Sequence, residues 1–172
     1  MKRFAVIGNP IEHSLSPMLH NLIFKSLKIN AKYEKINVME NKISKIIQWM
    51  KDGTLDGINV TIPYKENIIK FLDEMNYRAD TIGSVNCIMK INSKIIGNNT
   101  DWFGFAMSLK RNEINLLGEE VIVFGAGGTG KSILFSLKQL GVKKIILFNR
   151  TLKKAELLND DIIRSFPYNK FQ

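Results

Sequence analysis

A glycine-rich segment between two apolar runs constrains the fold of this chain more than any other feature. Residues 119–124 read EEVIVF and residues 143–148 read KKIILF, each typical of a short buried strand. Between them lie a glycine cluster at residues 125–130, a helical stretch to Leu140 and a turn at Gly141. Strand, glycine turn, helix and strand in this order predict one βαβ unit of the length that nucleotide-binding folds use.

The glycine segment satisfies two phosphate-binding patterns at once. Residues 125–132 read GAGGTGKS, which fits both the dinucleotide fingerprint G-x-G-x-x-G and the phosphate loop G-x-x-x-x-G-K-[ST]. Both patterns bring glycine backbone and a helix N-terminus close to negative charge. The loop alone therefore predicts phosphate binding and does not identify the ligand.

The end of the next strand separates the two patterns. A triphosphate-binding loop needs an acidic residue there to hold magnesium, whereas residues 149–151 read Asn-Arg-Thr. In a dinucleotide fold this position meets the adenosine ribose, where Asp or Glu selects NAD and arginine accommodates a 2′-phosphate. Arg150, backed by Lys153 and Lys154, therefore predicts an NADP pocket, and a P-loop nucleotide hydrolase is the disfavoured alternative.

Strand-like and helical runs also alternate in the first sixty residues. Residues 3–8, 32–38 and 56–62 are predicted strands, and residues 43–50 carry an apolar stripe at helical spacing. This alternation predicts right-handed βαβ units, that is, a parallel sheet with helices packed on it.

Local signals predict further elements of this half. Ser16 followed by Pro17 indicates a helix start with the serine as N-cap. Residues 64–81 are predicted as another helix, and residues 85–97 as two strands joined by a turn. The apolar residues of the first helix, expected to face a core, are Leu19, Leu22, Ile23 and Leu27.

The chain is thus predicted to be an α/β protein with two domains. Residues 1–101 form the first, and residues 102–117 form a linker helix and loop. Residues 118–172 form a Rossmann-like nucleotide domain that is incomplete, because only two strands with their helices are recognisable in it, and the tail at residues 168–172 is the candidate start of a third.

Composition excludes several classes of protein. The 25 basic and 16 acidic residues give a net charge of +9, but no basic stretch interleaves with aromatic residues, which argues against a nucleic-acid partner. No apolar run reaches the roughly 20 residues of a membrane-spanning helix, so we expect a cytoplasmic protein without a membrane partner. One cysteine and two histidines argue against an internal disulfide and against a metal site.

Polar residues follow the predicted strands of the first domain, where open α/β sheets place their ligand crevice. Serines at a helix start can hold a carboxylate, although plain helix capping explains Ser16 about as well. A lysine near an aspartate can act as acid or base, although idle ion pairs are more common. The candidates are Ser14, Ser16, Thr61, Lys65, Asn86 and Asp101.

Six separated motifs resemble the shikimate dehydrogenase family in order and spacing. They are GNP at 8–10 with SLSP at 14–17, NVTIPYK at 59–65, GSVN at 83–86, NNTD at 98–101, the glycine loop, and NRT at 149–151. The resemblance implies NADP-dependent, reversible reduction of 3-dehydroshikimate to shikimate in chorismate and aromatic amino acid biosynthesis. It also implies two α/β domains flanking a cleft, and it leaves a homodimer open.

The resemblance assigns roles to residues of this chain. The two serines would bind the substrate carboxylate, and Lys65 and Asp101 would form the catalytic pair, with the lysine as proton donor in the reduction. The residues implied around the substrate are Ser14, Ser16, Thr61, Lys65, Asn86 and Asp101. The residues expected at the cofactor are Gly125, Ala126, Gly127, Gly128, Thr129, Asn149, Arg150, Thr151, Lys153 and Lys154.

The chain departs from the family pattern in two ways. Ser84 stands where the family usually has alanine and Cys87 where it usually has threonine, whereas Asn86 between them is retained. The match also covers only about the first two thirds of the family's length, so the nicotinamide half of the cofactor pocket is expected to be missing. We therefore expect a truncated chain of doubtful activity, and an inactive shikimate-binding module is the alternative of another class.

Overall fold

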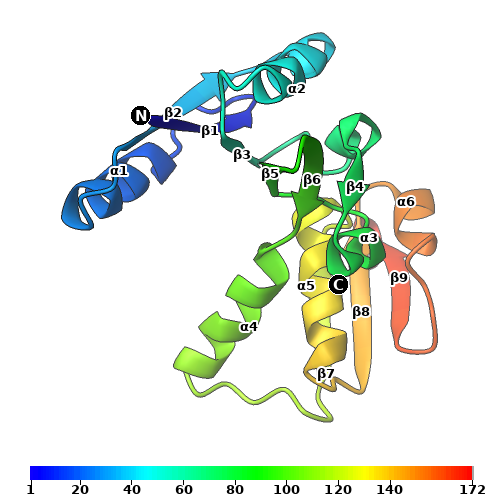
Figure 1. The fold of residues 1–172 in the computed structure, drawn as a ribbon. Helices are drawn as coiled ribbons and strands as arrows, with labels where there is room; N and C mark the ends of the chain where they lie inside the picture. Colours follow the sequence, from blue (N-terminus) through cyan, green and yellow to red (C-terminus); the bar gives the residue numbers. More distant parts are fainter. Residues whose placement is uncertain (172) are drawn as a thin grey trace. The chain divides into compact units, whose positions relative to one another are not determined.

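The chain forms two compact units, Met1–Asn99 and a second that begins at Thr100. This computed structural model describes residues 1–171 (Figure 1). The second unit opens with α4 (Asp101–Arg111), which packs on α5 (Gly128–Gln139). The segment expected to link two domains, residues 102–117, thus includes most of α4 and the loop that follows it. In the described residues, no helix is both long and apolar enough to cross a membrane.

A six-stranded mixed sheet organises the first unit, in the order β2-β1-β3-β5-β6-β4. Its strands are β1 (Lys2–Gly8), β2 (Ala31–Asn37), β3 (Gly57–Val60), β4 (Glu74–Met75), β5 (Cys87–Ile91) and β6 (Lys94–Asn98). The parallel pairing predicted for the first three strands is confirmed, because β1 lies between β2 and β3 and runs parallel to both. β5 and β6 then form an antiparallel hairpin, which confirms the two strands predicted over residues 85–97.

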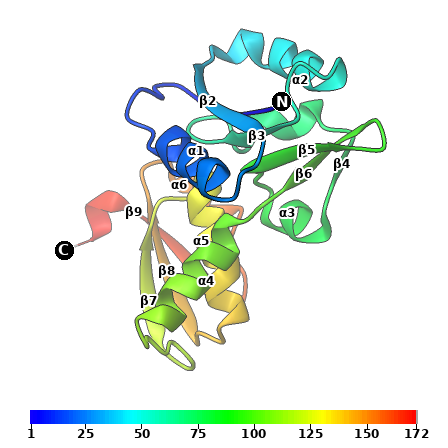
Figure 2. The same ribbon diagram turned by 60° about the vertical axis from the view of Figure 1, so that its left-hand side comes forward.

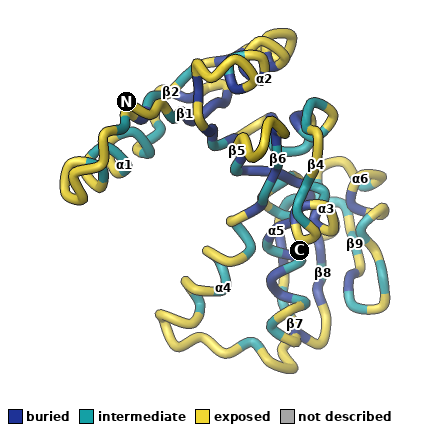
Figure 3. The backbone as a smooth tube through the Cα atoms, viewed as in Figure 1, coloured by how far each residue is buried: buried dark blue, intermediate teal, exposed yellow. Residues whose placement is uncertain are grey.

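Helix α2 (Ile43–Lys51) follows the 3-10 turn η1 (Glu40–Lys42) and covers the core of the first unit. The predicted apolar stripe is confirmed, because its members Ile43, Ile46, Ile47 and Met50 are all buried. They pack with the buried side chains of β1, β3 and β5 in one cluster. Figure 3 shows the contrast between this buried helix face and the exposed helix α1.

Helix α1 (Ser16–Ser26) contradicts two expectations. The N-cap position is occupied by Leu15 and not by Ser16, although proline does lie in the first turn. The leucines expected to face a core are exposed, with Leu22 at 60%. The helix instead contacts the sheet through polar and aromatic residues: the His20 ring stacks on Tyr33 at 4.2 Å, and Phe24 lies 5.8 Å from Phe4. Helical spacing identifies an apolar face but does not identify what covers it.

The single helix expected over residues 64–81 is wrong. The segment forms a 3-10 helix η2 (Asn67–Phe71), the short strand β4 and then α3 (Tyr77–Ile82). Pairing of β4 with β6 holds the middle of the segment extended, and the Asp73 carboxylate accepts from the Ile95 N–H at 2.7 Å. Asn76 then caps α3 by accepting from the Ala79 N–H at 2.7 Å.

The second unit contains a parallel three-stranded sheet in the order β7-β8-β9. β7 (Glu120–Phe124), α5 and β8 (Lys144–Asn149) confirm the predicted βαβ unit. A third strand is present, but it lies before the tail in which its start was expected: β9 (Ile163–Pro167) follows the short helix α6 (Leu152–Glu156) and pairs with β8, and residues 168–170 form a 3-10 turn. Figures 1 and 2 show α5 lying against this sheet with α4 beside it.

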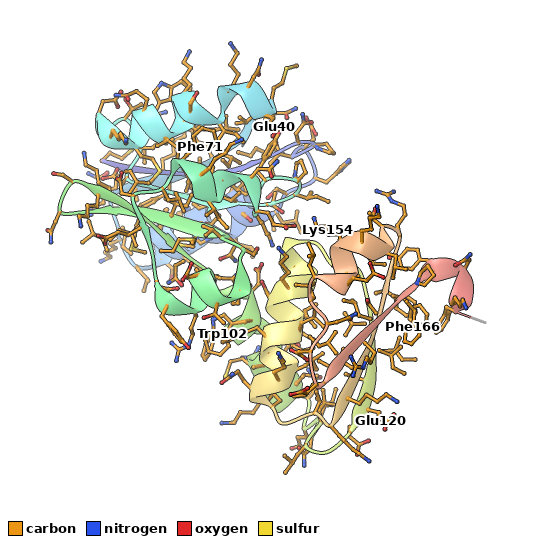
Figure 4. The ribbon with its side chains drawn as sticks, turned by 90° about the vertical axis from the view of Figure 1, so that its right-hand side faces the viewer. Glu40, Phe71, Trp102, Glu120, Lys154 and Phe166 are labelled. Atoms are coloured by element: carbon orange, nitrogen blue, oxygen red, sulfur yellow. The ribbon has the colours of Figure 1, made fainter. Side chains whose placement is uncertain are left out.

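Aromatic side chains collect on the strand ends of this sheet. Phe124 stacks on Phe148 with ring centroids 5.6 Å apart, and Phe171, after the 3-10 turn η3 (Tyr168–Lys170), meets both rings edge-on. Phe166 on β9 and Lys154 on α6 are marked in Figure 4. Phe124 and Phe171 remain 54% and 53% exposed. The cluster is thus only partly covered by the described residues.

Candidate functional site

A pocket of about 250 Å³ lies beyond the carboxyl ends of β1 and β3 in the first unit. We call it the serine pocket, and its lining residues are Val6, Pro10, Ile11, His13, Ser14, Ser16, Thr61 and Ile62. Three of the six residues predicted around a substrate, two serines and Thr61, therefore lie in one concave site. The motifs GNP…SLSP and NVTIPYK, about fifty residues apart in sequence, meet here because both follow neighbouring parallel strands.

The loop of residues 9–15, here called the serine loop, connects β1 to α1 and carries Ser14. The start of the loop is held to the segment after β3, which forms the other wall of the pocket, because the Asn9 N–H donates to the Ile62 carbonyl at 3.1 Å. Ile11 is buried against Val6 and Tyr33. The Ser14 N–H donates to the Ile11 carbonyl at 3.0 Å. An internal turn and one buried anchor therefore set the path of this loop.

Glycine is required where the two walls meet. A Cβ on Gly8 would lie 2.6 Å from Thr61 Cγ2 and 3.0 Å from the Ile62 carbonyl oxygen. The Thr61 N–H also donates to the Ile7 carbonyl at 2.9 Å. The missing side chain of Gly8 thus allows Thr61 to stand beside the end of β1.

Backbone hydrogen bonds bring two further predicted residues together. The Val85 N–H donates to the Lys65 carbonyl at 2.8 Å, which joins the motif NVTIPYK to GSVN. Asn86 is buried, and its carbonyl accepts from the Val60 N–H at 2.9 Å. Backbone hydrogen bonds therefore join the segment that carries Thr61 and Lys65 to the segment that carries Asn86, within the first unit. Asp101 is the first residue of α4 and belongs to the second unit.

Two residues that sequence reasoning missed support Asn86. The Tyr33 hydroxyl donates to Asn59 Oδ1 at 2.6 Å, and Asn59 Nδ2 donates to the Asn86 carbonyl at 3.1 Å. Burial, with a smaller effect from Cys87, raises the pKa of the Tyr33 hydroxyl, so this group stays protonated as a donor. Burial also raises the pKa of the Cys87 thiol. The available signals were the strand-like alternation of residues 32–38 for Tyr33 and the motif NVTIPYK for Asn59, but neither assigned these residues a role.

His13 was also missed as a pocket residue. It lines the serine pocket directly before Ser14, and its charge contributes to lowering the pKa of the Glu12 carboxyl, although backbone N–H groups contribute more. Its position beside the serine motif was the available signal.

The glycine loop of the second unit leads from β7 into α5. Gly125 has φ of +102°, a conformation that favours glycine, and Gly127 is the N-cap of α5. The loop closes tightly on its helix, because a Cβ on Gly130 would lie 2.1 Å from the Gly125 carbonyl oxygen. The glycines thus form the predicted turn into α5, and Gly130 also allows the loop to pack closely on this helix. The expected approach of the loop to a phosphate stays a prediction.

The strand end NRT lies against this loop. Asn149 Oδ1 accepts from the Ala126 N–H at 3.1 Å, and Asn149 Nδ2 donates to the Thr151 carbonyl at 2.8 Å. Arg150 is exposed beside them, and Lys153 and Lys154 are exposed on α6. Figure 4 marks Lys154. The glycine loop and residues 149–151 therefore lie at the carboxyl ends of the neighbouring parallel strands β7 and β8, and the Asn149 side chain holds the loop in place.

Ser132 argues against the phosphate-loop interpretation. A phosphate loop uses this hydroxyl to hold a magnesium ion. Here Ser132 is fully buried, and its hydroxyl donates to the Gly128 carbonyl at 3.0 Å inside α5. The residue is thus placed as an internal helix contact, and the glycine loop favours a dinucleotide over a magnesium triphosphate.

Two family models match the chain. The shikimate dehydrogenase substrate binding domain matches residues 6–88, and the shikimate / quinate 5-dehydrogenase model matches residues 108–172. The shikimate dehydrogenase (NADP(+)) of Pelagibacter ubique is 47% identical over 154 residues, which cover 90% of this chain and 58% of that protein. That of Carboxydothermus hydrogenoformans is 42% identical, with 93% of this chain and 57% of that protein covered.

Solved structures agree with these relatives. Shikimate dehydrogenase 1 from Peptoclostridium difficile gives a TM-score of 0.93 at 32% identity, covering 99% of this chain and 63% of that chain. Shikimate 5-dehydrogenase from Thermus thermophilus, solved with NADP(H) and shikimate, gives 0.87 at 34% identity, covering 97% and 63%. The chain spans about 60% of the length of these relatives. Two adjacent family models, shared motifs and a shared fold together show that the chain belongs to the shikimate dehydrogenase family.

Proposed function

We propose that this chain binds 3-dehydroshikimate or shikimate in the serine pocket, for the NADPH-dependent, reversible reduction that links the two in aromatic amino acid biosynthesis. The observation that carries the proposal is the convergence of Ser14, Ser16 and Thr61 on one pocket. Hydroxyl groups donate readily to a carboxylate, and shikimate carries one. The two serines would hold that carboxylate, and Thr61 would meet another oxygen of the ring.

The reduction of a ketone to an alcohol requires a hydride at carbon and a proton at oxygen. Lys65 supplies an ammonium group that can orient the C3 oxygen and deliver this proton. Asp101 would position and polarise the lysine, and Asn86 would donate to a ring oxygen. The backbone bond between Val85 and Lys65 supports this arrangement, because it holds the lysine segment beside Asn86.

The glycine loop fits a dinucleotide phosphate. Apart from the adjoining residues of the chain, no heavy atom of the described residues lies within 4 Å of where a Cβ on Gly125 or Gly127 would stand, so the backbone is open beside the N-terminus of α5. Bound NADPH supplies the hydride. Arg150 would pair with the 2′-phosphate, assisted by Lys153 and Lys154. The residues that would hold the rest of the cofactor are Gly125, Ala126, Gly127, Gly128, Thr129, Asn149 and Thr151.

A binding module without turnover is the second candidate. It is favoured by one observation, namely that the serine pocket is formed entirely by residues of the first unit. Such a module would hold shikimate even if the chain does not reduce 3-dehydroshikimate.

Calorimetry with shikimate, combined with an NADP-linked turnover assay, tests both candidates. We expect the chain to bind shikimate and Ser14→Ala to weaken binding by about tenfold, which corresponds to about one lost hydrogen bond to a charged group. Ser26→Ala, an exposed serine at the end of α1, is the matched control and should bind as the unmodified chain does.

The two measurements separate the outcomes. Binding with turnover supports the enzyme, and binding without turnover supports the module. Failure to bind shikimate, or equal binding by Ser14→Ala, would contradict the assignment of the serine pocket.

A further inference from the structure

The serine loop lies outside the sheet, so its position depends on contacts that it makes with neighbouring strands. Its first part is fixed by the Asn9 N–H and by buried Ile11. Ser14 lies further along, just before α1 begins at Ser16. The Ser14 N–H donates to the Ile11 carbonyl, and the Ser14 hydroxyl accepts from the Ser16 N–H at 3.4 Å. These bonds hold the serines to the loop, so the place of both hydroxyls depends on how residues 12 and 13 are attached to the sheet.

Glu12 provides that attachment at the carboxyl end of β2. Its Oε1 accepts from Asn37 Nδ2 at 3.0 Å, and its Oε2 accepts from the Ile11 N–H at 3.0 Å. The ammonium group of Lys35 donates to the Glu12 backbone carbonyl. One residue thus joins the loop to two side chains of β2, and its carboxylate also stabilises the turn of the loop itself.

The placement of Glu12 also matters for charge. Ile11 and His13, the residues on either side, line the serine pocket, whereas Glu12 is absent from the lining described for it. A carboxylate inside a pocket for an anionic ligand would repel that ligand. The contacts with Asn37 and Ile11 hold this negative charge at β2.

The carboxylate is ionised in this setting. Backbone N–H groups of Glu12 and Ile11 lower the pKa of the Glu12 carboxyl, Asn37 and His13 lower it further, and partial desolvation opposes them. An ionised acceptor forms stronger hydrogen bonds than a neutral one. The attachment is therefore fully formed at neutral pH.

We propose that Glu12 is a positioning residue of the serine pocket, which fixes the serine loop to Asn37 and Lys35 so that Ser14 and Ser16 face a carboxylate ligand together. The role in ligand binding rests on the proposed function, whereas the role in fixing the loop does not. Glu12 is exposed, and exposed hydrogen bonds contribute little to global stability. Its loss should therefore affect the loop and the affinity, with little change in the unfolding of the first unit.

The first test compares shikimate affinity among four variants of the full chain. Glu12→Ala should raise the Kd about tenfold, which lies in the range expected for a residue that acts on a site without contacting the ligand. Glu12→Gln keeps an oxygen that can accept from Asn37, so it should recover a large part of the loss. Asn37→Ala should raise the Kd by a similar factor, and the double variant Glu12→Ala/Asn37→Ala should be no worse than Glu12→Ala alone.

Glu34→Ala is the matched control for charge. Glu34 lies on β2, and its carboxylate pairs with Lys32 of the same strand at 2.8 Å and with Arg3 of β1 at 3.1 Å. The Glu34→Ala variant removes one negative charge, as Glu12→Ala does, but it leaves the attachment of the serine loop in place. It should therefore leave the Kd unchanged. An equal loss of affinity in Glu34→Ala would mean that net charge, and not the attachment, explains the effect.

The second test is hydrogen exchange without ligand. In Glu12→Ala the Ser14 amide, which donates to the Ile11 carbonyl, should exchange at least tenfold faster, whereas the amides of β1 should keep their rates. If shikimate fails to bind the unmodified chain, the proposed function is wrong. The exchange rates of Glu12→Ala and the unmodified chain, measured without ligand, still test whether Glu12 fixes the loop. Unchanged exchange in the serine loop of Glu12→Ala would overturn the inference.

Discussion

The Tyr33 hydroxyl on β2 donates to Asn59 Oδ1 on β3 at 2.6 Å, across the strand that separates them. The same amide donates to the Asn86 carbonyl at 3.1 Å. Asn21 of α1 holds the Tyr33 backbone from the other side, accepting from its N–H at 2.9 Å and donating to its carbonyl at 2.8 Å. A polar chain thus runs through the first unit from α1 to the predicted substrate residue Asn86.

Replacing Tyr33 by phenylalanine tests this chain. The change leaves Asn59 Oδ1 without its donor in a partly buried position, so we expect the first unit to lose about 1–3 kcal/mol of unfolding free energy. Urea denaturation of the full chain measures it. Tyr77→Phe, at a side chain that is 82% exposed, is the control and should keep its midpoint. Equal midpoints for Tyr33→Phe and the unmodified chain would show that the hydroxyl contributes nothing.

Gly8 should be sensitive to the smallest substitution. Gly8→Ala places a methyl group 2.6 Å from Thr61 Cγ2 and 3.0 Å from the Ile62 carbonyl, so the two walls of the serine pocket must separate. We expect a loss of about 1–3 kcal/mol together with weaker shikimate binding. Gly104→Ala in α4 meets no described heavy atom within 4 Å, and it should be neutral or stabilising by about 0.5–1 kcal/mol. Thermal unfolding compares the two, and equal behaviour would contradict the close approach.

Arg150 should determine cofactor preference. Its exposed guanidinium follows β8 beside the glycine loop, where it can pair with a 2′-phosphate through two hydrogen bonds. We expect NADP to bind more tightly than NAD, and Arg150→Ala to remove the difference. Arg164→Ala, an exposed arginine on β9, should retain it. Calorimetry that finds equal affinities for the two cofactors in the unmodified chain would refute this role.

The Asp160 carboxylate should make the second unit sensitive to acid. It accepts from the Ile163 N–H at 2.8 Å and the Ile162 N–H at 2.9 Å and pairs with Lys138. Burial raises its pKa, but the Lys138 ammonium and these two N–H groups outweigh burial, so the pKa falls below its ordinary value of 3.8. A lowered pKa stabilises the fold above the ordinary value, and this stabilisation is lost as the pH falls through the lowered one.

The pH dependence can be measured with a neighbouring control. At pH 7, Asp160→Asn should unfold at lower urea concentration than the unmodified chain, and this difference should shrink as the pH falls below about 4. Asp161→Asn, an exposed neighbour, should show no such difference at either pH. A difference for Asp160→Asn that grows on acidification would have the wrong sign for this explanation.

The fold was predictable where its signals are local. The glycine turn, the first three strands and the buried stripe of α2 depend on residues that are close in sequence, and the structure confirms them, although β3 ends at Val60 and not at the predicted residue 62. The helix expected over residues 64–81 failed because pairing of β4 with β6, some twenty residues away, overrides helical spacing. For α1 the helical spacing of the apolar residues was right, but the face that they form is exposed. No sequence pattern states which face of a helix packs on the sheet.

The site was predictable only in its motif residues. Ser14, Ser16 and Thr61 follow from motif and strand order, and they meet in one pocket. Glu12, Tyr33 and Asn59 act through partners 25 to 27 residues away, so their contacts exist only after the sheet has formed. Glu12 and Tyr33 carry no motif that predicts these contacts, and Asn59 stands in NVTIPYK without a role assigned to it there.

The last prediction concerns the sheet of the second unit. Within the described residues β7 pairs only with β8, so one of its edges lacks a strand partner, and Ile122, Phe124 and Phe171 beside it are each more than half exposed. Open edges and exposed aromatic clusters favour dye binding and local opening. We expect the 172-residue chain to bind an apolar fluorescent dye, and its amides at residues 119–148 to exchange faster than those at residues 3–62. Phe171→Ser should reduce the dye signal, whereas Leu157→Ser, an 85% exposed residue after α6, should not. Equal protection of the two ranges, with no dye bound, would show that the described strands already form a complete and stable sheet.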